Sequence, residues 1–353
     1  MKKIFFLSII LCVIFFQINC APKELTEEER AINNKKAEDL FISGQNYKKE
    51  KRYWKARRKF NRVIDKYPES DFADKAAFEI AEVFREAGNY WRAYEKYQRV
   101  ADDFPSTRLM PKVSERQIEV GNYYWDRDKK YEAVEIYKKA LENDRFGELA
   151  ADIQYRVAGY YFEYAKNYKG LFKSIYKEDN FEVSIIEYKN ALTNYPNHTL
   201  NVLAKYRLAL AYFYTSRPWY NDQENTDEAI TAFQDLETER NADEFMDDTK
   251  EKMALLFDKK AESEYRIGEF YLKQHLWKSA RIYYQSVVKN DYSKVWNSKA
   301  YFGSGESYFK EKKWNDAKEH YEKSVSEGTG YVNNLLLKDR LIKIEKELNL
   351  TQD

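Results

Sequence analysis

The chain is poor in cysteine, histidine, glycine and proline. Its only cysteines, Cys12 and Cys20, lie within the first 20 residues, so no disulfide bond braces the rest of the chain. Three histidines among 353 residues are too few and too scattered for a histidine-based metal site. Eleven glycines and six prolines are few for this length, which favours long helices over strands and tight turns.

Neither sign of charge dominates the chain. There are 60 Lys and Arg residues against 59 Asp and Glu residues, a balance that gives no reason to expect binding to nucleic acid. The 43% hydrophobic content is ample for a folded core. Aromatic residues are abundant, with 31 Tyr and 21 Phe. This many tyrosines predicts half-buried packing sites whose hydroxyl groups reach water.

The sequence contains no motif for catalysis or for a cofactor. We find no glycine-rich phosphate loop, no HExxH, no Cys/His metal spacing and no nucleophile elbow. His275 and His320 are expected on solvated surface. We therefore predict a protein that is not an enzyme, with no cofactor and no metal site. The alternative, an enzyme with catalytic residues in 166–180, would have to rely on Ser174 without a neighbouring base.

The N-terminus predicts a signal peptide over residues 1–19. Lys2 and Lys3 precede an apolar stretch, residues 4–16, that is short for a membrane-spanning helix. An uncleaved membrane anchor is the alternative. Cys20 follows and resembles the lipid-modified, palmitate-bearing cysteine of bacterial lipoproteins, although Gln17 and Asn19 depart from the usual residues there. We therefore predict a lipid on Cys20 and a polar tether over the rest of 20–36.

One pattern recurs seven times after residue 36. A small residue is followed three positions later by an aromatic residue, and a second small residue further on is followed by an aromatic residue four positions later. Each spacing places its pair on one face of a helix. In five units the two small residues are 12 apart, which leaves room for a turn between two helices. The first pairs are Gly44/Tyr47, Ala81/Phe84, Gly121/Tyr124, Gly159/Phe162, Ala209/Tyr212, Gly268/Tyr271 and Gly305/Tyr308; the second pairs are Ala56/Phe60, Ala93/Tyr97, Ala133/Tyr137, Ser184/Tyr188, Ala229/Phe233, Ala280/Tyr284 and Ala317/Tyr321.

This pattern resembles the tetratricopeptide repeat (TPR), a unit of about 34 residues built from two antiparallel helices. Pro68, Pro105 and Pro196 end units one, two and four, because proline cannot continue a helix. The predicted fold class is all-α: a tetratricopeptide (TPR) superhelical solenoid of about seven helix pairs plus a C-terminal capping helix. The expected divisions are 37–111 for units one and two, 112–198 for units three and four, 199–257 for unit five and a long connecting helix, 258–330 for units six and seven, and 331–353 for the capping helix.

Two inserts and one long helix interrupt the repeat period. The insert 166–180 in unit four mixes Lys with Phe, Tyr and Leu. It either touches a membrane surface or a partner, or it forms an extended helix pair with a packed loop. A second insert lies within 215–227 in unit five, and residues 243–273 predict one long helix.

Together with the lipoprotein signal, three stretches resemble a known family. Residues 59–107, 208–236 and 255–288 are similar to the tetratricopeptide-repeat outer-membrane lipoprotein of the β-barrel assembly machinery (BamD/YfiO/ComL-like). That family usually has five repeats, so residues 112–196 are expected to be additional. The second insert and the helix after it carry the resemblance at Arg217, Asp222, Gln223, Thr226, Ala229 and Phe233.

The resemblance implies binding without catalysis, at the periplasmic face of the outer membrane. Such a scaffold binds unfolded outer-membrane proteins and the barrel-forming assembly component during β-barrel assembly and insertion. The alternative is another periplasmic TPR lipoprotein scaffold, pilotin-like or an organiser of peptidoglycan synthesis. The implied groove for client peptides comprises Phe41, Gln45, Phe78, Glu82 and Arg85, and the implied partner-binding residues are Tyr265, Arg266, Glu269, Phe302, Glu306 and Phe309.

Overall fold

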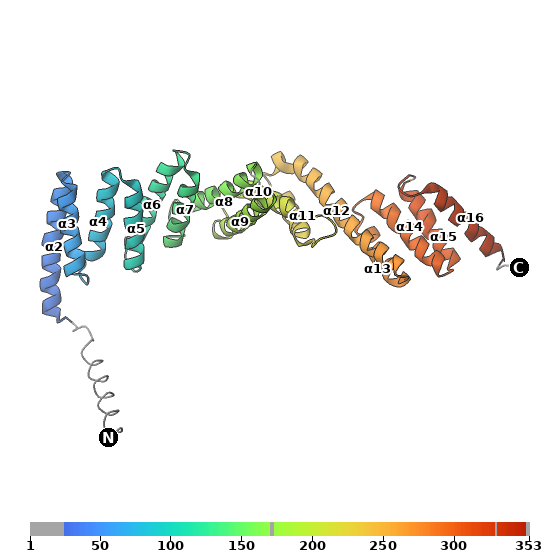
Figure 1. The fold of residues 1–353 in the computed structure, drawn as a ribbon, viewed down its shortest axis with the longest axis horizontal. Helices are drawn as coiled ribbons and strands as arrows, with labels where there is room; N and C mark the ends of the chain where they lie inside the picture. The colour runs from blue at the N-terminus through green and yellow to red at the C-terminus, as the bar shows by residue number, and fades with distance from the viewer. Residues whose placement is uncertain (1–24, 170–172, 329, 351–353) are drawn as a thin grey trace, which may run out of the picture. The chain divides into compact units, whose positions relative to one another are not determined.

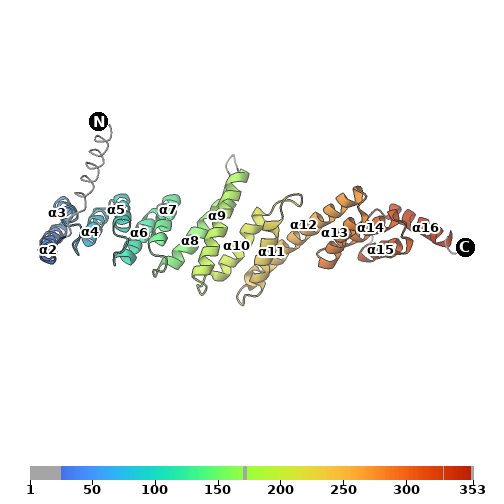
Figure 2. The same cartoon turned by 90° about the horizontal axis from the view of Figure 1, so that it is seen from below.

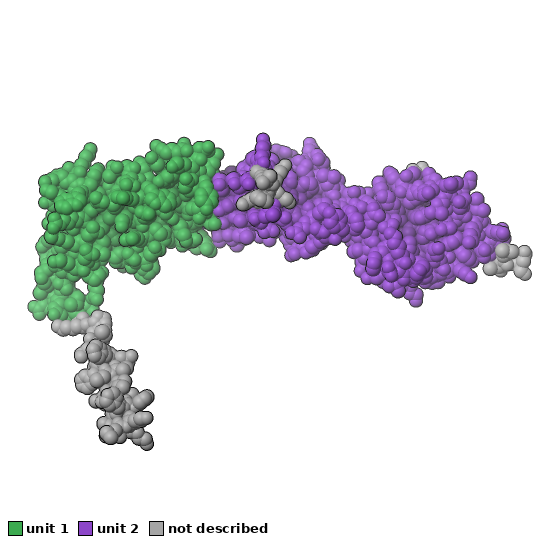
Figure 3. Space-filling view, in the orientation of Figure 1, with its two compact units in different colours: residues 1–150 green, residues 151–353 purple. Residues whose placement is uncertain are grey.

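The chain is all-α in a computed structural model that describes residues 25–169, 173–328 and 330–350. These described residues form fifteen α-helices and one short 3-10 helix, η1, and no strand (Figures 1 and 2). The expected signal peptide, residues 1–19, and Cys20 lie outside the described residues. The chain divides into two compact units: unit 1 comprises residues 1–150 and unit 2 comprises residues 151–353 (Figure 3).

Unit 1 contains three helix pairs, which correspond to the first three predicted repeats. Successive helices lie side by side, and each pair is joined by a tight turn (Figures 1 and 2). The first helices of the pairs are α2 (Glu27–Lys49), α4 (Ala73–Glu86) and α6 (Met110–Trp125), and the second helices are α3 (Tyr53–Lys66), α5 (Tyr90–Asp103) and α7 (Lys130–Asn143).

Unit 2 contains the other four pairs and a final helix. The first helices are α8 (Ala150–Asn167), α10 (Asn201–Thr215), α12 (Met246–Lys273) and α14 (Lys294–Lys310). The second helices are α9 (Lys173–Asn194), α11 (Glu224–Glu237), α13 (Trp277–Asn290) and α15 (Trp314–Glu327). The final helix, α16 (Asn334–Leu350), packs on α15, and η1 (Asp243–Phe245) leads into α12. The long helix and the capping helix therefore form where the sequence predicted them.

The first helix begins earlier than the sequence analysis expected. Residues 20–36 were expected to be a tether, yet α2 begins at Glu27. Thr26 caps this end, because its hydroxyl accepts from the Glu29 backbone N–H while the Glu29 carboxylate accepts from the Thr26 backbone N–H. Acidic residues in the first turn stabilise the helix further.

In four repeats, a glycine of the first helix lies against the aromatic ring of the second helix. A Cβ atom on Gly44 would lie 2.5 Å from Phe60 Cε1, and one on Gly305 would lie 2.7 Å from Tyr321 Cδ1. The ring of Tyr284 lies between two glycines, because Gly303 on the next first helix is equally close to it. The predicted pairing of small and aromatic residues is therefore the contact that joins the helices and stacks one repeat on the next.

The turn inside a repeat contains one residue with positive φ. It is found seven positions after the small residue in five repeats, and only one of the five is glycine. His275, at φ 59°, is one of these turn residues and is exposed, as the sequence predicted. The others are Lys51, Gly88, Asp128 and Lys312.

Two substitutions of glycine by alanine test the helix contact. In Gly268→Ala the new Cβ meets the Tyr284 ring at 2.7 Å, and the overpacking, about 1–3 kcal/mol, outweighs the helix propensity gain of about 1 kcal/mol. At the matching position Gly159, a Cβ meets only Arg207 Nη1 at 3.3 Å and Tyr188 Oη at 3.7 Å. We expect thermal unfolding followed by circular dichroism to have a lower midpoint for Gly268→Ala and an unchanged or higher one for Gly159→Ala. Equal midpoints would contradict the contact.

Candidate functional site

In three repeats, the residue after the small residue on the first helix accepts a hydrogen bond from a tyrosine of the second helix. Tyr97 donates its hydroxyl hydrogen to Glu82. In the same way Tyr137 donates to Asn122 Oδ1 at 2.7 Å and Tyr321 donates to Glu306 Oε1 at 2.5 Å. In the first repeat the aromatic residue is Phe60, which has no hydroxyl, and the residue after the small residue is Gln45. A polar layer therefore accompanies the ring contacts in these repeats.

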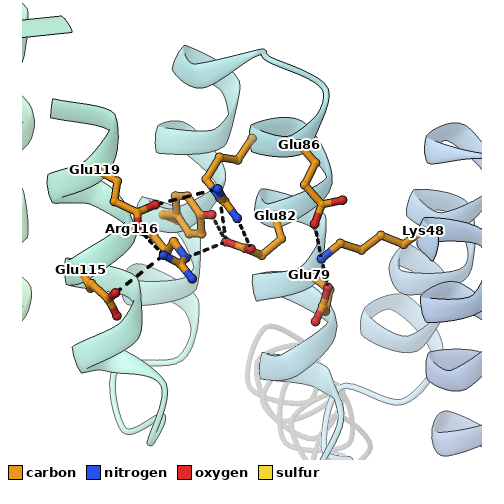
Figure 4. Close-up of polar contacts among 9 residues, drawn as sticks. Lys48, Glu79, Glu82, Glu86, Glu115, Arg116 and Glu119 are labelled. Atoms are coloured by element: carbon orange, nitrogen blue, oxygen red, sulfur yellow. Dashed lines mark hydrogen bonds and ion pairs between the residues drawn. The ribbon is translucent and has the colours of Figure 1, made fainter. Parts of the chain in front are cut away.

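Glu82 is the centre of an ion-pair cluster in unit 1, shown in Figure 4. Arg85 Nη2 donates to its carboxylate at 2.8 Å, and Arg116 Nε, from the next first helix, lies 3.3 Å from it. Burial alone would raise the pKa of Glu82, but the hydrogen bonds from Arg85 and Tyr97 and the charges of Arg85 and Arg116 lower it below its usual value. Glu82 is therefore an anion at neutral pH, held by the cations around it.

A second ion-pair group connects α2 to α4. Lys48 Nζ lies 2.7 Å from Glu79 and 3.0 Å from Glu86 (Figure 4). With the Glu82 cluster, these pairs link the first helices of all three repeats in unit 1. The linked side chains supply fixed hydrogen-bond donors and acceptors, and no group of three metal-ligating residues occurs among the described residues. Such an arrangement stabilises the stacking of the repeats.

The residues predicted for the client groove separate into two kinds. Glu82 and Arg85 belong to the ion-pair cluster, and Gln45 is half-buried. Phe41 and Phe78 are only 8% and 4% exposed. Their rings pack against Phe60 and Tyr97, each with centroids 5.6 Å apart. The two phenylalanines therefore contribute to the cores of repeats one and two and offer little surface.

Most of the predicted partner-binding residues in unit 2 also make internal contacts. The Tyr265 ring packs on Tyr284 and Trp296 with centroids 5.5 and 5.4 Å apart. Phe302 packs on Tyr321 at 5.4 Å. The helix α16 covers the end of α14, where Phe309 is buried.

Arg340 on α16 completes the polar layer of the last repeat. Its Nε donates to Glu306 Oε1 at 2.7 Å, and its guanidinium lies 4.7 Å from the Phe309 ring centroid. Arg340 thus does for Glu306 what Arg116 does for Glu82. Neither arginine was identified from the sequence, because each comes from a helix outside the repeat that it contacts: Arg116 from α6 and Arg340 from α16.

Arg266 and Glu269 form the part of the predicted partner surface that faces outward. Arg266 Nη1 donates to Glu269 at 3.2 Å and its Nη2 donates to Glu262 at 3.2 Å. The guanidinium also lies 5.4 Å from the ring of Trp219, in the second insert. Glu269 occupies the position that accepts a tyrosine hydrogen bond in other repeats, but the hydroxyl of Tyr284 has no hydrogen-bond partner among the described residues.

Two exposed aromatic residues follow members of this group directly in the sequence. Tyr220 follows Trp219 and is 67% exposed, and Phe270 lies one helical turn after Arg266 and is 58% exposed. We call Trp219, Tyr220, Arg266, Glu269 and Phe270 the insert surface. It combines aromatic area with an accessible ion pair, which is the composition enriched at protein interfaces.

The insert residues that carried the family resemblance build this loop. Gln223 Nε2 donates to the backbone carbonyls of Pro218 and Asn221 at 2.9 and 2.8 Å. Thr226 donates its hydroxyl hydrogen to Gln223 Oε1 at 3.0 Å, and Asp222 Oδ1 accepts from the Glu224 backbone N–H. Their role in the structure is to shape the turn that carries Trp219.

The two inserts meet in unit 2. Arg217 Nη2 donates to Glu178 at 2.6 Å, and both residues line a cleft of about 450 Å³ with Lys166, Lys177 and Phe181. In the described part of 166–180 the insert lengthens the α8–α9 pair, as one of the two predicted alternatives held.

The position of His320 differs from the sequence expectation of a solvated residue. His320 is half-buried, and its ring lies 5.1 Å from Tyr308 and 5.9 Å from Tyr301. Burial lowers its pKa, so it is neutral at physiological pH. Its position next to Tyr321 turns it toward α14, which the sequence spacing alone did not reveal.

The predicted lipidation residue, Cys20, lies outside the described residues. Among the residues that are described, no helix has the length and apolar character needed to cross a membrane.

Comparison with known proteins gives two family matches. The family described as YfiO, outer membrane lipoprotein, matches residues 129–323, and a tetratricopeptide repeat family matches residues 40–70. No curated protein matches the chain.

Among solved structures the chain is similar to tetratricopeptide repeat proteins. One is from Parabacteroides merdae, with 14% identity over 88% of this chain and 98% of that chain and a TM-score of 0.27. Another is the TPR2AB domain of yeast Sti1 in its pHSP90 complex, with 13% identity over 88% of this chain and 99% of that chain and a TM-score of 0.29.

Replacement of Glu82 by glutamine tests the ion-pair cluster. Because the folded-state pKa of Glu82 lies below its ordinary value of 4.5, the carboxylate stabilises the fold above pH 4.5, and this contribution is lost as the pH falls through the lowered pKa. We expect Glu82→Gln to reduce the free energy of unfolding by about 1–3 kcal/mol at pH 7, with a smaller difference in acid. Urea unfolding at several pH values measures this.

The matched control is Glu115→Gln, since Glu115 belongs to the same cluster but is 53% exposed. It should change stability little at any pH. A Glu82→Gln variant that behaves like this control would show that the buried pairs do not stabilise the repeats.

Proposed function

The chain belongs to the YfiO family of outer membrane lipoproteins, whose match covers residues 129–323, and we propose that it is a scaffold for β-barrel assembly. As a TPR outer-membrane lipoprotein it binds other proteins. The proposed partners are unfolded outer-membrane proteins and the barrel-forming assembly component, at the periplasmic face of the outer membrane. The family match is the observation that carries this proposal.

The family match covers the proposed partner-binding residues but not the proposed client groove. It includes α12 and α14, and with them all six proposed partner-binding residues. It begins within residues 112–196, which we expected to be additional, and leaves out residues 59–107, which we expected to resemble the family. The client groove in repeats one and two therefore rests on the resemblance and on the polar cluster around Glu82.

The insert surface is the best supported docking site for the barrel-forming component. Its Arg266 and Glu269 are the predicted partner residues that remain accessible, with side chains 39% and 29% exposed. Trp219, which contacts Arg266, and Phe270, one helical turn after it, add aromatic area. Aromatic and arginine side chains in this arrangement are the usual anchors of a protein interface.

The double substitution Trp219→Ala with Arg266→Glu tests this site. Loss of two anchor residues is expected to weaken partner binding by about 2–4 kcal/mol, or roughly 30-fold or more. In a depletion strain, the variant should fail to co-isolate the barrel-forming component and should not restore outer-membrane barrel proteins. The control variant, Trp277→Ala with Lys278→Glu, also removes a tryptophan and reverses a positive charge, but on α13. It should behave as the wild type.

Two results would contradict the proposed function. Unchanged barrel protein levels on depletion would count against the assembly role. Co-isolation of a secretin without the barrel-forming component would favour the alternative scaffold role.

Anchoring through Cys20 is a separate proposal. Labelling of cells with palmitate should mark the wild-type chain and a Cys12→Ala variant, while Cys20→Ala should stay unlabelled. Both substitutions remove one of the two thiols in the chain, so only lipidation at Cys20 separates them. Equal labelling of the two variants would exclude Cys20 as the attachment point.

A further inference from the structure

The near-neutral charge of the whole chain conceals one strongly basic helix. Within Tyr53–Lys66, helix α3 has six Lys and Arg residues and a single acidic residue, Asp65. The formal charge of the entire chain is +1. Other second helices differ, and α11 has five acidic residues and no Lys or Arg. The charge of α3 is therefore a local property and not a feature of the repeat.

Three of the six basic residues of α3 form a stripe on its outer face. Ala56, Phe60 and Val63 are buried against the rest of the repeat. The opposite face carries four exposed residues at intervals of four, which lie one above another on a helix. Trp54 begins the stripe, is 61% exposed and has the Arg58 guanidinium 5.5 Å from its ring centroid. The stripe consists of Trp54, Arg58, Arg62 and Lys66.

The three cations of the stripe have no carboxylate partner among the described residues. In the part of the chain that the structure describes, Arg58, Arg62 and Lys66 take part in no ion pair. By contrast, Lys48 and Arg116 in the same unit are each held by two or more carboxylates. The stripe is thus an unpaired positive surface with an aromatic residue at one end, and it fits an anionic partner.

The position of α3 places this surface near the N-terminal end of the chain. Leu25, where the described chain begins, and Lys66, where α3 ends, line the same pocket of about 510 Å³. The five residues from Cys20 to Leu25 reach at most about 18 Å. A membrane held at Cys20 or at the apolar residues before it is therefore within reach of the Lys66 end of α3.

We propose that the outer face of α3 binds anionic phospholipid head groups at the membrane surface. Basic side chains beside a lipid anchor are attracted to anionic lipids, and a second attachment of this kind makes weak anchoring stable. Trp54 suits the same surface, since tryptophan favours the boundary between head groups and acyl chains. The inference rests on membrane attachment at the N-terminus and is independent of the partners proposed for unit 2.

Tryptophan quenching in vesicles tests this contact on the full chain. The chain is reconstituted into vesicles that contain brominated phosphatidylcholine, with or without one quarter phosphatidylglycerol. The difference between the wild type and Trp54→Phe isolates the Trp54 signal. We expect Trp54 quenching only with phosphatidylglycerol, and its loss in 1 M salt, where the Debye length falls to about 3 Å.

Charge reversal supplies the matched variants. Arg58→Glu, Arg62→Glu and Lys66→Glu together should abolish the quenching while Trp54 remains. Lys278→Glu, Lys289→Glu and Lys294→Glu place the same charge change on exposed residues of unit 2 and should leave it intact. Circular dichroism confirms that both variants keep their helices.

Three outcomes would overturn the proposal. Trp54 quenching of equal size without phosphatidylglycerol would mean that the N-terminal attachment alone brings α3 to the membrane. No quenching in either vesicle would mean that α3 does not contact lipid, whether or not the chain stays with the vesicles. Self-association that the α3 variant abolishes, without lipid-dependent quenching, would assign the stripe to an acidic face, such as α11, of a second copy.

Discussion

The contact between a small residue on one helix and an aromatic ring on the next determines how this chain folds. A glycine or alanine leaves room for the ring, and the ring fills the space between its own first helix and the first helix of the following repeat. Tyr284, held between Gly268 and Gly303, shows both halves of this arrangement. Since no disulfide braces the described chain, every longer-range feature depends on these ring positions being occupied.

The polar layer of the protein follows from the same geometry. A tyrosine ring in the groove carries its hydroxyl to the first helix, where Glu82 or Glu306 accepts the hydrogen bond. A carboxylate held in this way needs a cation, and arginines supply it. In the sixth repeat the carboxylate of Glu269 pairs instead with Arg266, which stays accessible beside the insert. Glu82 and Glu306 accept a tyrosine hydrogen bond and belong to structural ion pairs. Glu269 accepts none from Tyr284, and its ion pair with Arg266 belongs to the candidate docking site.

Sequence spacing was enough to predict the helix pairs, the long α12 and the capping α16, because contacts inside a repeat have a fixed offset along the chain. Contacts between repeats have no such offset. Arg116 and Arg340 were therefore missed. Phe41 and Phe78 were expected on a surface but lie in the core, where each packs on an aromatic ring of its own repeat. The positive charge of α3 was also missed, because the net charge of the whole chain hides a local excess of cations.

Arg116 and Arg340 pair with carboxylates of helices that precede their own in the chain, so the order of the helices matters for these ion pairs. Glu82 pairs with Arg116 from α6 in addition to Arg85 from its own helix, and Glu306 pairs with Arg340 from α16, so both carboxylates receive a cation from a helix later in the chain. The repeats are for this reason not interchangeable parts. Without α16, Glu306 would lose the guanidinium of Arg340, whereas Glu82 without α6 would keep Arg85 from its own helix. Duplication can lengthen such a protein from within, but the last helix has to stay last.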